Sequence, residues 1–303
     1  MKIKIVFMGS PDFALPTLRM LNDNFEVVGV VTQPDRPAGR GRVEQPPDVK
    51  VLAQDLGLPI IQPASLKAAD ALTQLVDWAP DVIVVAAFGQ ILRENVLNLP
   101  LYGCVNVHAS LLPRWRGAAP VQAALLHDDV TGVTIMKMDK GLDTGPILSQ
   151  RQILITEEMT AGSLFDQLAN MGAELLVETL PGYISGEIHP RPQDDALATY
   201  APRLKREDGL IDFDHSAVYL GRMVRAYNPW PSAYQFWHDR RVKVHKAHAK
   251  TGVDIAPGAP AVVDDQPAWG TQDGLLVLDE LQVAGKQRVS GLEFLHGAKD
   301  WLS

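Results

Sequence analysis

Apolar segments of strand length alternate with segments of helix length along the first part of the chain. Residues 3–8, 27–32 and 81–87 are apolar and rich in Val and Ile, as buried strands are. A helical segment at 13–21 separates the first two, and this order predicts a parallel sheet with right-handed crossovers. The alternation predicts further strands at 59–62, 103–109, 131–137 and 147–155, and further helices at 49–57, 66–78, 161–183 and from Pro120.

The pattern changes after residue 206, where short apolar segments are broken by Gly, Pro and Asp. Short strands at this spacing favour a small β-barrel or sandwich. We expect a helix at 216–226 and strands at 233–237, 242–247, 261–263 and 275–282. The stretch 190–206 is rich in Pro and charged residues, as connections between domains often are. The predicted organisation is a first domain at 1–189, a linker at 190–206 and a second domain at 207–303.

The composition describes a globular protein with a substantial core. The chain has 303 residues, of which 46% are hydrophobic and 21% are charged. Its single cysteine, Cys104, excludes an internal disulfide framework, and its strand setting predicts a small buried side chain rather than a nucleophile. No apolar run approaches the roughly 20 residues that span a bilayer, and the first residues lack a signal-peptide pattern. We expect a cytoplasmic protein.

Charge alone leaves the nature of the partner open. The net charge of −8 argues mildly against nucleic acid, but RNA binding requires only a local basic surface. The long loop at 33–48 contains several arginines, and loops of this length are usually functional or mobile. Arg241, Lys243 and His245 share one face of a predicted strand. On composition alone, either feature is also compatible with an ordinary solvated surface.

The strongest chemical signal is the segment 105–120. Asn106 and His108 lie two residues apart, so a strand presents both on the same face. One supplies an amide donor and the other an imidazole that titrates near neutral pH. Asp143 lies between Gly141 and Gly145, which allow a tight turn. A hydrogen-bonded core histidine and a turn-capping aspartate are the alternative interpretations. The first turn contains only Gly9, which argues against dinucleotide binding.

The motif Asn106-Val-His-Ala-Ser-Leu-Leu-Pro-Arg-Trp-Arg-Gly-Ala-Ala-Pro, with Asp139-Lys-Gly-Leu-Asp-Thr-Gly downstream, closely resembles the formyltransferases that use 10-formyltetrahydrofolate. The resemblance covers nearly the whole chain, because the Gly9-Ser-Pro turn, the loop from Thr32, Arg225-Ala-Tyr-Asn-Pro-Trp-Pro and Ala284-Gly-Lys also resemble the family. It implies a Rossmann-like α/β domain with a doubly wound, mostly parallel sheet. A smaller C-terminal β-barrel of the oligonucleotide-binding (OB) type is implied to follow.

The resemblance implies transfer of the formyl group of 10-formyltetrahydrofolate to the α-amino group of initiator methionyl-tRNA. Asn106, His108 and Asp143 match the catalytic residues of the family. The first two would stabilise the oxyanion, and Asp143 would orient His108 and accept a proton. No metal is implied. The folate co-substrate would lie against Ser110, Leu111, Leu112 and Pro113, walled by Phe88, Gly89, Gln90, Ile91, Leu92, Met138 and Asp139.

For the tRNA, the resemblance favours binding by Arg36, Arg40 and Arg42 of the long loop and by Arg241 and Lys243 of the second domain. The loop departs from the family after Arg42, where Glu44 and Asp48 dilute its positive charge. Nothing in the sequence requires more than a monomer, so a monomer is predicted.

Two other functions remain open at this point. A formyltransferase acting on glycinamide ribonucleotide or an amino sugar would keep the chemistry and change the acceptor. The C-terminal domain and the arginine loop argue against glycinamide ribonucleotide, which needs neither. A non-catalytic RNA-binding module is disfavoured because Asn106, His108 and Asp143 are all present.

Overall fold

The structure is a computed structural model that describes residues 2–38 and 43–302. Arg40 and Arg42 lie outside the described residues. The chain divides into two compact units. The first comprises Met1–Pro120, Val130–Ile153 and Phe165–Ala201, and the second comprises Val121–Asp129, Leu154–Leu164 and Pro202–Ser303. The domain boundaries expected from the sequence stay a prediction.

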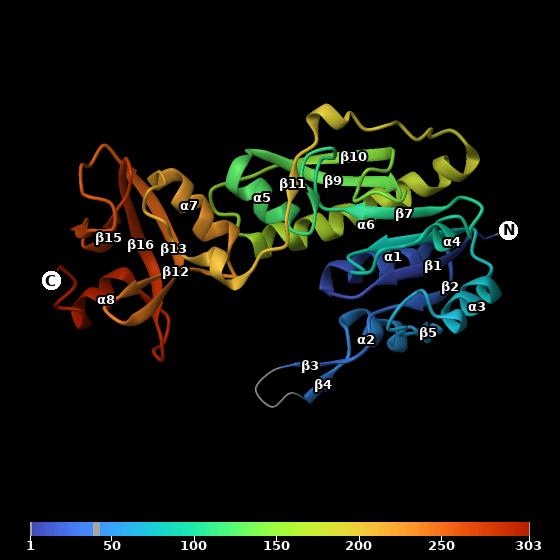
Figure 1. The fold of residues 1–303 in the computed structure, drawn as a ribbon, viewed down its shortest axis with the longest axis horizontal. Helices are drawn as coiled ribbons and strands as arrows, with labels where there is room; N and C mark the ends of the chain where they lie inside the picture. Colours follow the sequence, from blue (N-terminus) through green and yellow to red (C-terminus); the bar gives the residue numbers. More distant parts are fainter. Residues whose placement is uncertain (1, 39–42, 303) are drawn as a thin grey trace. The chain divides into compact units, whose positions relative to one another are not determined.

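The first unit is built on a seven-stranded sheet with the order β10-β9-β7-β6-β1-β2-β5 (Figure 1). Its strands are β1 (Lys4–Gly9), β2 (Glu26–Val31), β5 (Ile60–Ile61), β6 (Val82–Ala86), β7 (Cys104–His108), β9 (Val130–Lys137) and β10 (Ile147–Leu154). The four pairs from β5 to β7 are parallel, whereas β7 and β9 are antiparallel. The mostly parallel sheet confirms the predicted fold class.

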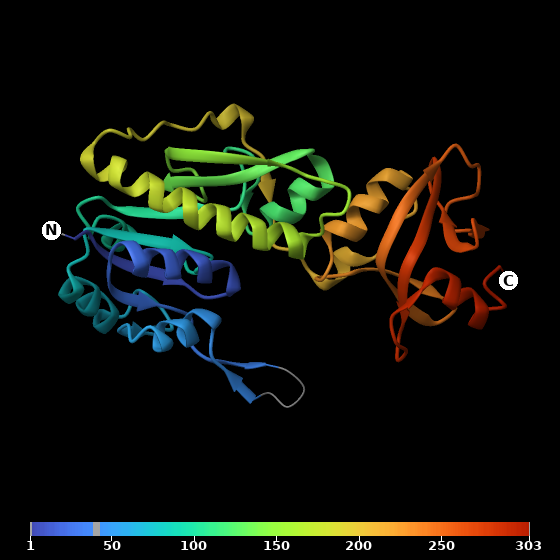
Figure 2. The ribbon, with the colours of Figure 1, turned by 180° about the vertical axis from the view of Figure 1, so that it is seen from behind.

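Helices cover both faces of this sheet, as a doubly wound fold requires. They are the 3₁₀ helix η1 (Asp12–Ala14) and the α-helices α1 (Leu15–Asn24), α2 (Asp48–Asp55), α3 (Ala69–Trp78), α4 (Glu94–Leu97) and α6 (Ala161–Ser185). Helix α5 (Pro120–His127) belongs, apart from Pro120, to the second unit. Helices α1 and α6 lie on one face (Figure 2), where Phe13 and Phe165 pack with ring centroids 4.9 Å apart. Gly172 lets α6 approach β7 closely, because a Cβ there would lie 2.5 Å from Val107.

The opposite face is packed by α3 and α4. Leu75 of α3 and Val96 of α4 belong to one buried cluster with Val6, Ile83 and Cys104. Cys104 and Asn106 share a strand face, so the apolar face of β7 changes to a polar one as the strand ends. The same sheet that builds the core therefore delivers Asn106 and His108 to its carboxyl edge, where open α/β sheets bind ligands.

The loop expected at 33–48 contains structure that its sequence did not predict. β3 (Arg36–Ala38) and β4 (Val43–Gln45) pair as a short antiparallel ribbon. Asp35 anchors its base, since Lys50 Nζ donates to Asp35 Oδ2 at 2.6 Å and Gln62 Nε2 donates to Asp35 Oδ1 at 2.7 Å. These two hydrogen bonds, that from Gln62 above all, lower the pKa of Asp35.

The second unit carries an antiparallel sheet in the order β12-β13-β16-β15-β14, with β17 beside β16. Its strands are β12 (Ala233–Trp237), β13 (Arg240–Thr251), β14 (Pro260–Val263), β15 (Gln266–Gly270), β16 (Gly274–Val283) and β17 (Val289–Ser290), with helices α7 (Ala217–Ala226) and α8 (Gly291–Gly297). This antiparallel domain was predicted, but β15 and α8 were not. Pro267 argued against a strand at β15. The capping box of Ser290 and Glu293 is a sequence signal that could have predicted α8.

Aromatic packing closes one end of this sheet. Trp301 is 2% exposed and lies against Trp237, Trp269 and Phe294, with ring centroids 5.9, 5.4 and 5.3 Å away. Its indole N–H donates to the carbonyl of Ala261 at 2.8 Å, so its polar atom is also satisfied. Within the described ranges, no helix is long and apolar enough to cross a membrane.

Candidate active site

The strand β7 ends in two nearly buried polar side chains. Asn106 is 9% exposed and His108 is 6% exposed, and both belong to the strand face that begins with Cys104. No hydrogen bond joins the Asn106 amide to another residue of the described ranges, so this donor is available to a ligand. Cys104 is fully buried, and burial raises the pKa of its thiol to about 12. The prediction that it is a small core residue is consistent with this setting.

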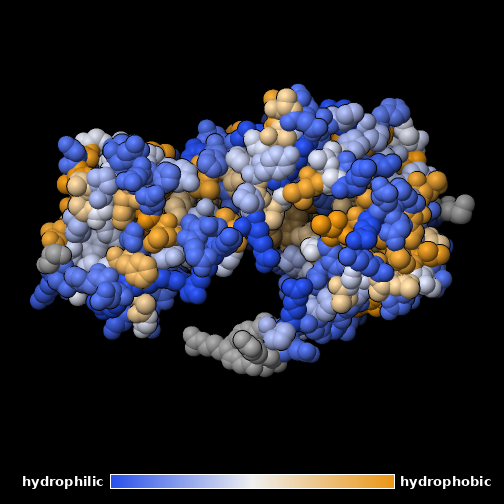
Figure 3. Space-filling model, viewed as in Figure 1, coloured by the Kyte–Doolittle hydropathy of each residue, from blue (hydrophilic) through white to orange (hydrophobic). Residues whose placement is uncertain are grey.

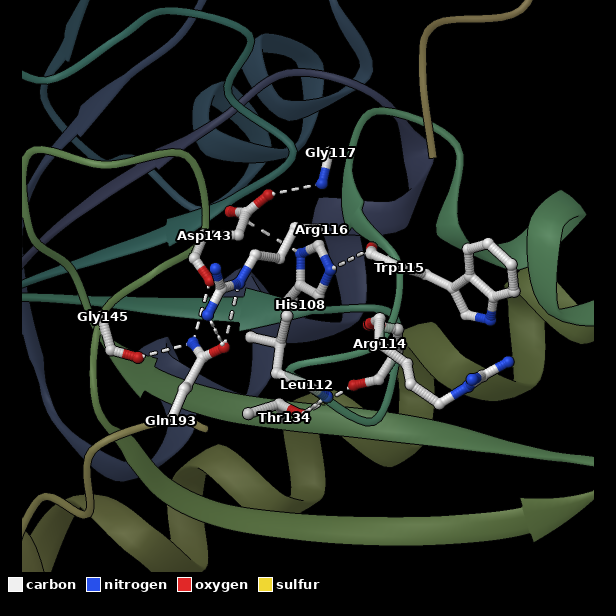
Figure 4. A network of polar contacts seen from close by, with 11 residues as sticks. His108, Leu112, Arg114, Trp115, Arg116, Gly117, Thr134, Asp143, Gly145 and Gln193 are labelled. Carbon is white, nitrogen blue, oxygen red and sulfur yellow. Dashed lines mark hydrogen bonds and ion pairs between the residues drawn. The ribbon is translucent and has the colours of Figure 1, made fainter. Parts of the chain in front are cut away.

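The imidazole of His108 is held by a backbone carbonyl. Its Nε2 lies 3.1 Å from the carbonyl oxygen of Trp115 (Figure 4). Because a carbonyl only accepts, Nε2 must carry the proton. Trp115 reaches this position with φ of 60°, a left-handed conformation that few tryptophans adopt. The ring is thereby turned so that Nδ1 is the nitrogen left for chemistry.

The Asp143 carboxylate faces that nitrogen. Asp143 Oδ1 lies 3.8 Å from His108 Nδ1, which is too far for a direct hydrogen bond. Its Oδ2 accepts the backbone N–H of Gly117 at 2.9 Å. The loop therefore places a carboxylate and an imidazole opposite each other with a short gap between them (Figure 4). Like Trp115, Asp143 has a left-handed backbone, with φ of 53°.

The rest of the loop between β9 and β10 is internally braced. Asp139 Oδ1 accepts the backbone N–H of Gly141 at 3.0 Å and the hydroxyl of Thr144 at 2.6 Å. Gly145 packs so tightly that a Cβ would lie 1.8 Å from the carbonyl oxygen of Lys137. The two glycines that the sequence singled out thus have different roles, a turn at Gly141 and a close backbone contact at Gly145.

The segment predicted to contact folate includes a rigid turn after β7. Ser110 Oγ donates to the carbonyl of Arg114 at 2.6 Å. The backbone N–H of Leu112 donates to the hydroxyl of Thr134 at 3.1 Å, and this hydroxyl donates to the carbonyl of Ser110 at 2.6 Å. Leu112 itself packs against Met136 and Met138. An apolar wall with satisfied backbone groups is therefore present beside His108.

The second predicted wall of the folate site follows β6. The carbonyl of Phe88 accepts Gln33 Nε2 at 3.0 Å, and the Gln90 side chain bonds to Leu66 and Pro63 at 3.2 and 3.1 Å. Gln90 thus supports this wall through its side chain. Ile91 is 87% exposed, a large apolar side chain without protein cover. Figure 3 shows such hydrophobic residues scattered over a mainly hydrophilic surface of the first unit.

Two further residues support the site, although neither is among the predicted site residues. Arg116 is 2% exposed although it is always charged, and its guanidinium donates to Gln193 Oε1 and Asp195 Oδ1. Gln193 in turn bonds to the loop that carries Asp143. Arg116 belongs to the quoted motif, but Gln193 lies in the stretch expected to be a linker, where no local pattern pointed to it.

The basic residues predicted to bind RNA lie in both units. Arg36 is exposed and donates to Gln33 Oε1 at 3.0 Å. Arg241 and Lys243 line a cavity of about 420 Å³ on the antiparallel sheet, together with Arg206, Gln282, Ala284 and Gly285. Arg206 joins them although the sequence analysis did not select it. Among the described residues, no group of His, Cys, Asp and Glu side chains is arranged to hold a metal ion.

Comparison with known proteins gives one family over both units. Residues 1–180 match formyl transferase, and residues 203–299 match the formyl transferase C-terminal domain. A methionyl-tRNA formyltransferase of Citrifermentans bemidjiense is 47% identical over 98% of this chain and 94% of its own length. That of Geobacter metallireducens is 44% identical over 98% and 96%. Among solved structures, the sugar 3N-formyl transferase WlaRD shares the fold at a TM-score of 0.69 and 18% identity, covering 95% of this chain and 100% of its own.

Proposed function

The chain belongs to the formyl transferase family, and from that premise we propose that Asn106, His108 and Asp143 transfer a formyl group to the α-amino group of methionyl-tRNA. The formyl donor is 10-formyltetrahydrofolate, the co-substrate of the family. Full-length identity near 45% to relatives named methionyl-tRNA formyltransferase supports the acceptor, because it extends through the second unit. The proposal includes the expected cytoplasmic monomer.

One observation carries the assignment of the catalytic residues. The imidazole of His108 has Nε2 tied to a carbonyl and Nδ1 facing the carboxylate of Asp143 across 3.8 Å. Nδ1 and Oδ1 are not hydrogen-bonded to each other at this distance. Each is therefore available to exchange a proton with a group that lies beside the pair.

The reaction begins when the amine of the methionyl ester attacks the formyl carbon. A free α-amino group titrates at about 7.7–8.0, and the ester beside it lowers this pKa further, so much of the attacking amine is neutral at pH 7. Attack forms a C–N bond and moves an electron pair onto the formyl oxygen. The Asn106 amide donates to this oxyanion, and His108 donates from Nδ1 when protonated.

Collapse of the intermediate completes the transfer. The ammonium formed by attack loses a proton toward Asp143, directly or through water. The C–N bond to the folate breaks as the oxyanion pair returns to carbon, and the folate nitrogen takes up a proton. Asp143 is suited to this exchange because Gly117 stabilises only one carboxylate oxygen, Oδ2, and leaves Oδ1 for the reacting groups.

The folate would be held by the turn after β7 and the wall after β6. Most of the predicted folate-binding residues would supply apolar and backbone contacts: Leu111, Leu112, Pro113, Phe88, Gly89, Ile91, Leu92 and Met138. The polar members would be Ser110, Gln90 and Asp139. These two segments suit an aromatic ring system, because hydrogen bonds from Gln33 and to Thr134 fix their backbone while an apolar side chain, Ile91, remains exposed.

The tRNA would be held by local positive charge on an acidic protein. Arg241 and Lys243 line one cavity with Arg206, and three cations around one concave site favour phosphate. Arg36, Arg40 and Arg42 stay proposed as the loop contacts, the latter two outside the described residues.

The experiment that tests the acceptor offers three candidates in turn with 10-formyltetrahydrofolate: methionyl-tRNA, glycinamide ribonucleotide and a dTDP-linked amino sugar. Mass spectrometry identifies the formylated product. We expect formylmethionyl-tRNA and no formylation of the other two. A formylated amino sugar with unchanged methionyl-tRNA would overturn the proposed acceptor and keep the chemistry.

A further inference from the structure

The segment Arg191–Ala201, here called the strap, crosses both loops that hold the catalytic side chains. Its first residue, Arg191, pairs with Ile147 through two backbone hydrogen bonds of 2.8 Å. At its other end, β11 (Tyr200–Ala201) pairs in parallel with β8 (Arg116–Gly117). Thr199 accepts the backbone N–H of Trp115 through its hydroxyl at 2.9 Å. The strap is therefore attached beside the Asp143 loop and beside the turn that orients His108.

In the first half of the strap, the Gln193 side chain faces inward. The residues from 189 to 197 are exposed except for Gln193, which is half-buried. Its Nε2 donates to the carbonyls of Asp143 at 2.8 Å and Gly145 at 2.7 Å. Its Oε1 accepts two N–H groups of Arg116, at 3.1 and 2.8 Å. Figure 4 draws Gln193 between Arg116 and the backbone of Asp143 and Gly145.

This network admits only one orientation of the amide. A guanidinium can only donate and a backbone carbonyl can only accept, so the oxygen of Gln193 must face Arg116 and its nitrogen must face the loop. Glutamine is the side chain of this length that offers both an acceptor oxygen and a donor nitrogen. A glutamate would keep the contact with Arg116 but set a second oxygen against two carbonyl oxygens.

The Asp143 loop needs such support from outside. Asp143 has a left-handed backbone, which costs roughly 1–2 kcal/mol for a residue with a Cβ. Among the described residues, the loop's internal hydrogen bonds are those of Asp139 and the one from Lys137 to Pro146, and none involves the backbone of Asp143. Gly117 fixes the carboxylate and Gln193 fixes the main chain, so the two together determine where Oδ1 lies relative to His108.

We propose that Gln193 is a positioning residue for formyl transfer, which holds the Asp143 loop so that the carboxylate faces His108 Nδ1. The proposal rests on the proposed catalytic role of Asp143. Gln193 acts through the loop and not on the substrate, and Arg116 orients its amide. The strap is then part of the active-site scaffold.

The test compares Gln193→Glu with Asp195→Ala in single-turnover formylation of methionyl-tRNA. Asp195 is the matched control, because its exposed carboxylate also pairs with Arg116, at 2.6 Å, but makes no bond to the Asp143 loop. We expect Gln193→Glu to lower the turnover rate roughly 10- to 100-fold, with the Michaelis constants of both substrates within about threefold of the parent, since misplacing a catalytic group by about 1 Å has this effect. Asp195→Ala should stay within about twofold.

A second experiment distinguishes a positioning role of Gln193 from a general loss of structure in its variants. If Gln193 acts through Asp143, then Gln193→Glu added to Asp143→Asn should lower the rate by less than about threefold more. An equal loss on both backgrounds, or a Gln193→Glu rate like that of Asp195→Ala, would overturn the proposal. Should Gln193→Glu not fold, Gln193→Met removes all four bonds of the amide without adding charge and is read by the same criteria.

The catalytic role of Asp143 and the positioning role of Gln193 can be rejected separately. Near-normal turnover of Asp143→Asn would remove the catalytic assignment and the positioning role with it. A collapse in Asp143→Asn with a parent-like Gln193→Glu would leave the catalytic assignment intact and reject only the role of Gln193.

Discussion

The proposed catalytic site of the first unit and the basic cavity of the second use polar residues in opposite ways. The side chains of His108 and Asp143 are only 7% and 16% exposed, and each bonds to a backbone group of the segment 115–117. The cavity at Arg241 and Lys243 is lined by long side chains that only partly leave water. The first site holds individual side-chain atoms in fixed positions, and the second gathers several positive charges around one cavity.

This difference teaches how the two sites would respond to change. A preorganised site loses function steeply when one atom is altered, because its donors are worth most where water is excluded. A solvated cationic surface loses little per residue, and its contribution falls with salt. Activity should therefore depend on single atoms in the first unit and on summed charge in the second.

The largest effect is expected for Asp143→Asn, which keeps the size and the acceptor for Gly117 but cannot take a proton. Turnover should fall roughly 100- to 10,000-fold, with a melting temperature within about 2 °C of the parent. Single-turnover formylation and thermal unfolding measure the two quantities. Asp264→Asn, which alters an exposed carboxylate paired with Lys250, is the control. If both variants kept parent activity, the fixed-atom description of the first site would be wrong.

The next effect is that of the oxyanion donors. Asn106→Ala and His108→Ala should each lower turnover roughly 100- to 1,000-fold, because each removes a hydrogen bond made in the transition state. The dissociation constant for folate, measured by titration, should stay near the parent value. Loss confined to substrate binding would reassign these residues to a binding role.

A smaller effect is expected for the basic cavity of the second unit, where each cation should contribute little. Lys243→Gln should raise the Michaelis constant for methionyl-tRNA a few-fold at low salt and reduce the slope of log affinity against log salt by roughly 0.7–0.9. Folate binding should not change. Arg151→Gln is the control, because that cation already pairs with Glu174 and Glu178 at 3.3 and 2.6 Å. Matching salt dependence in both variants would place the RNA elsewhere.

The smallest effect is expected in the pH dependence of stability, through His245 beside the basic cavity. Burial lowers the pKa of His245 below its ordinary 6.5, and the cations Arg288 and Lys243 lower it further, against a hydrogen bond to Gln282. The unfolded chain then binds the proton first, so this stability is complete above pH 6.5 and is lost as the pH falls through the folded pKa. His245→Gln should narrow the difference in melting temperature between about pH 7.5 and about pH 5.5. An unchanged difference would contradict this.

The sequence by itself determined the sheet and the face on which the catalytic strand is polar. Runs of apolar residues predict buried strands. Side chains two residues apart in a strand point to the same face, so Asn106 and His108 share a face wherever the strand lies in the sheet. The motif around Arg114 to Pro120 determined the family resemblance. Where signals were short or interrupted, as in the ribbon β3–β4 and at Pro267 of β15, the local pattern was too weak to predict the element.

Only the tertiary structure decided which atoms the catalytic groups face. The bond from His108 to Trp115, the bond from Gly117 to Asp143 and the amide of Gln193, 50 positions from Asp143, all join segments that meet through chain folding. Such contacts depend on backbone angles and on the pairing of β8 with β11, and no local periodicity encodes either. The physical reason is that hydrophobic patterning specifies which faces are buried, whereas directional hydrogen bonds across long sequence separations are satisfied only once the fold has brought their partners together.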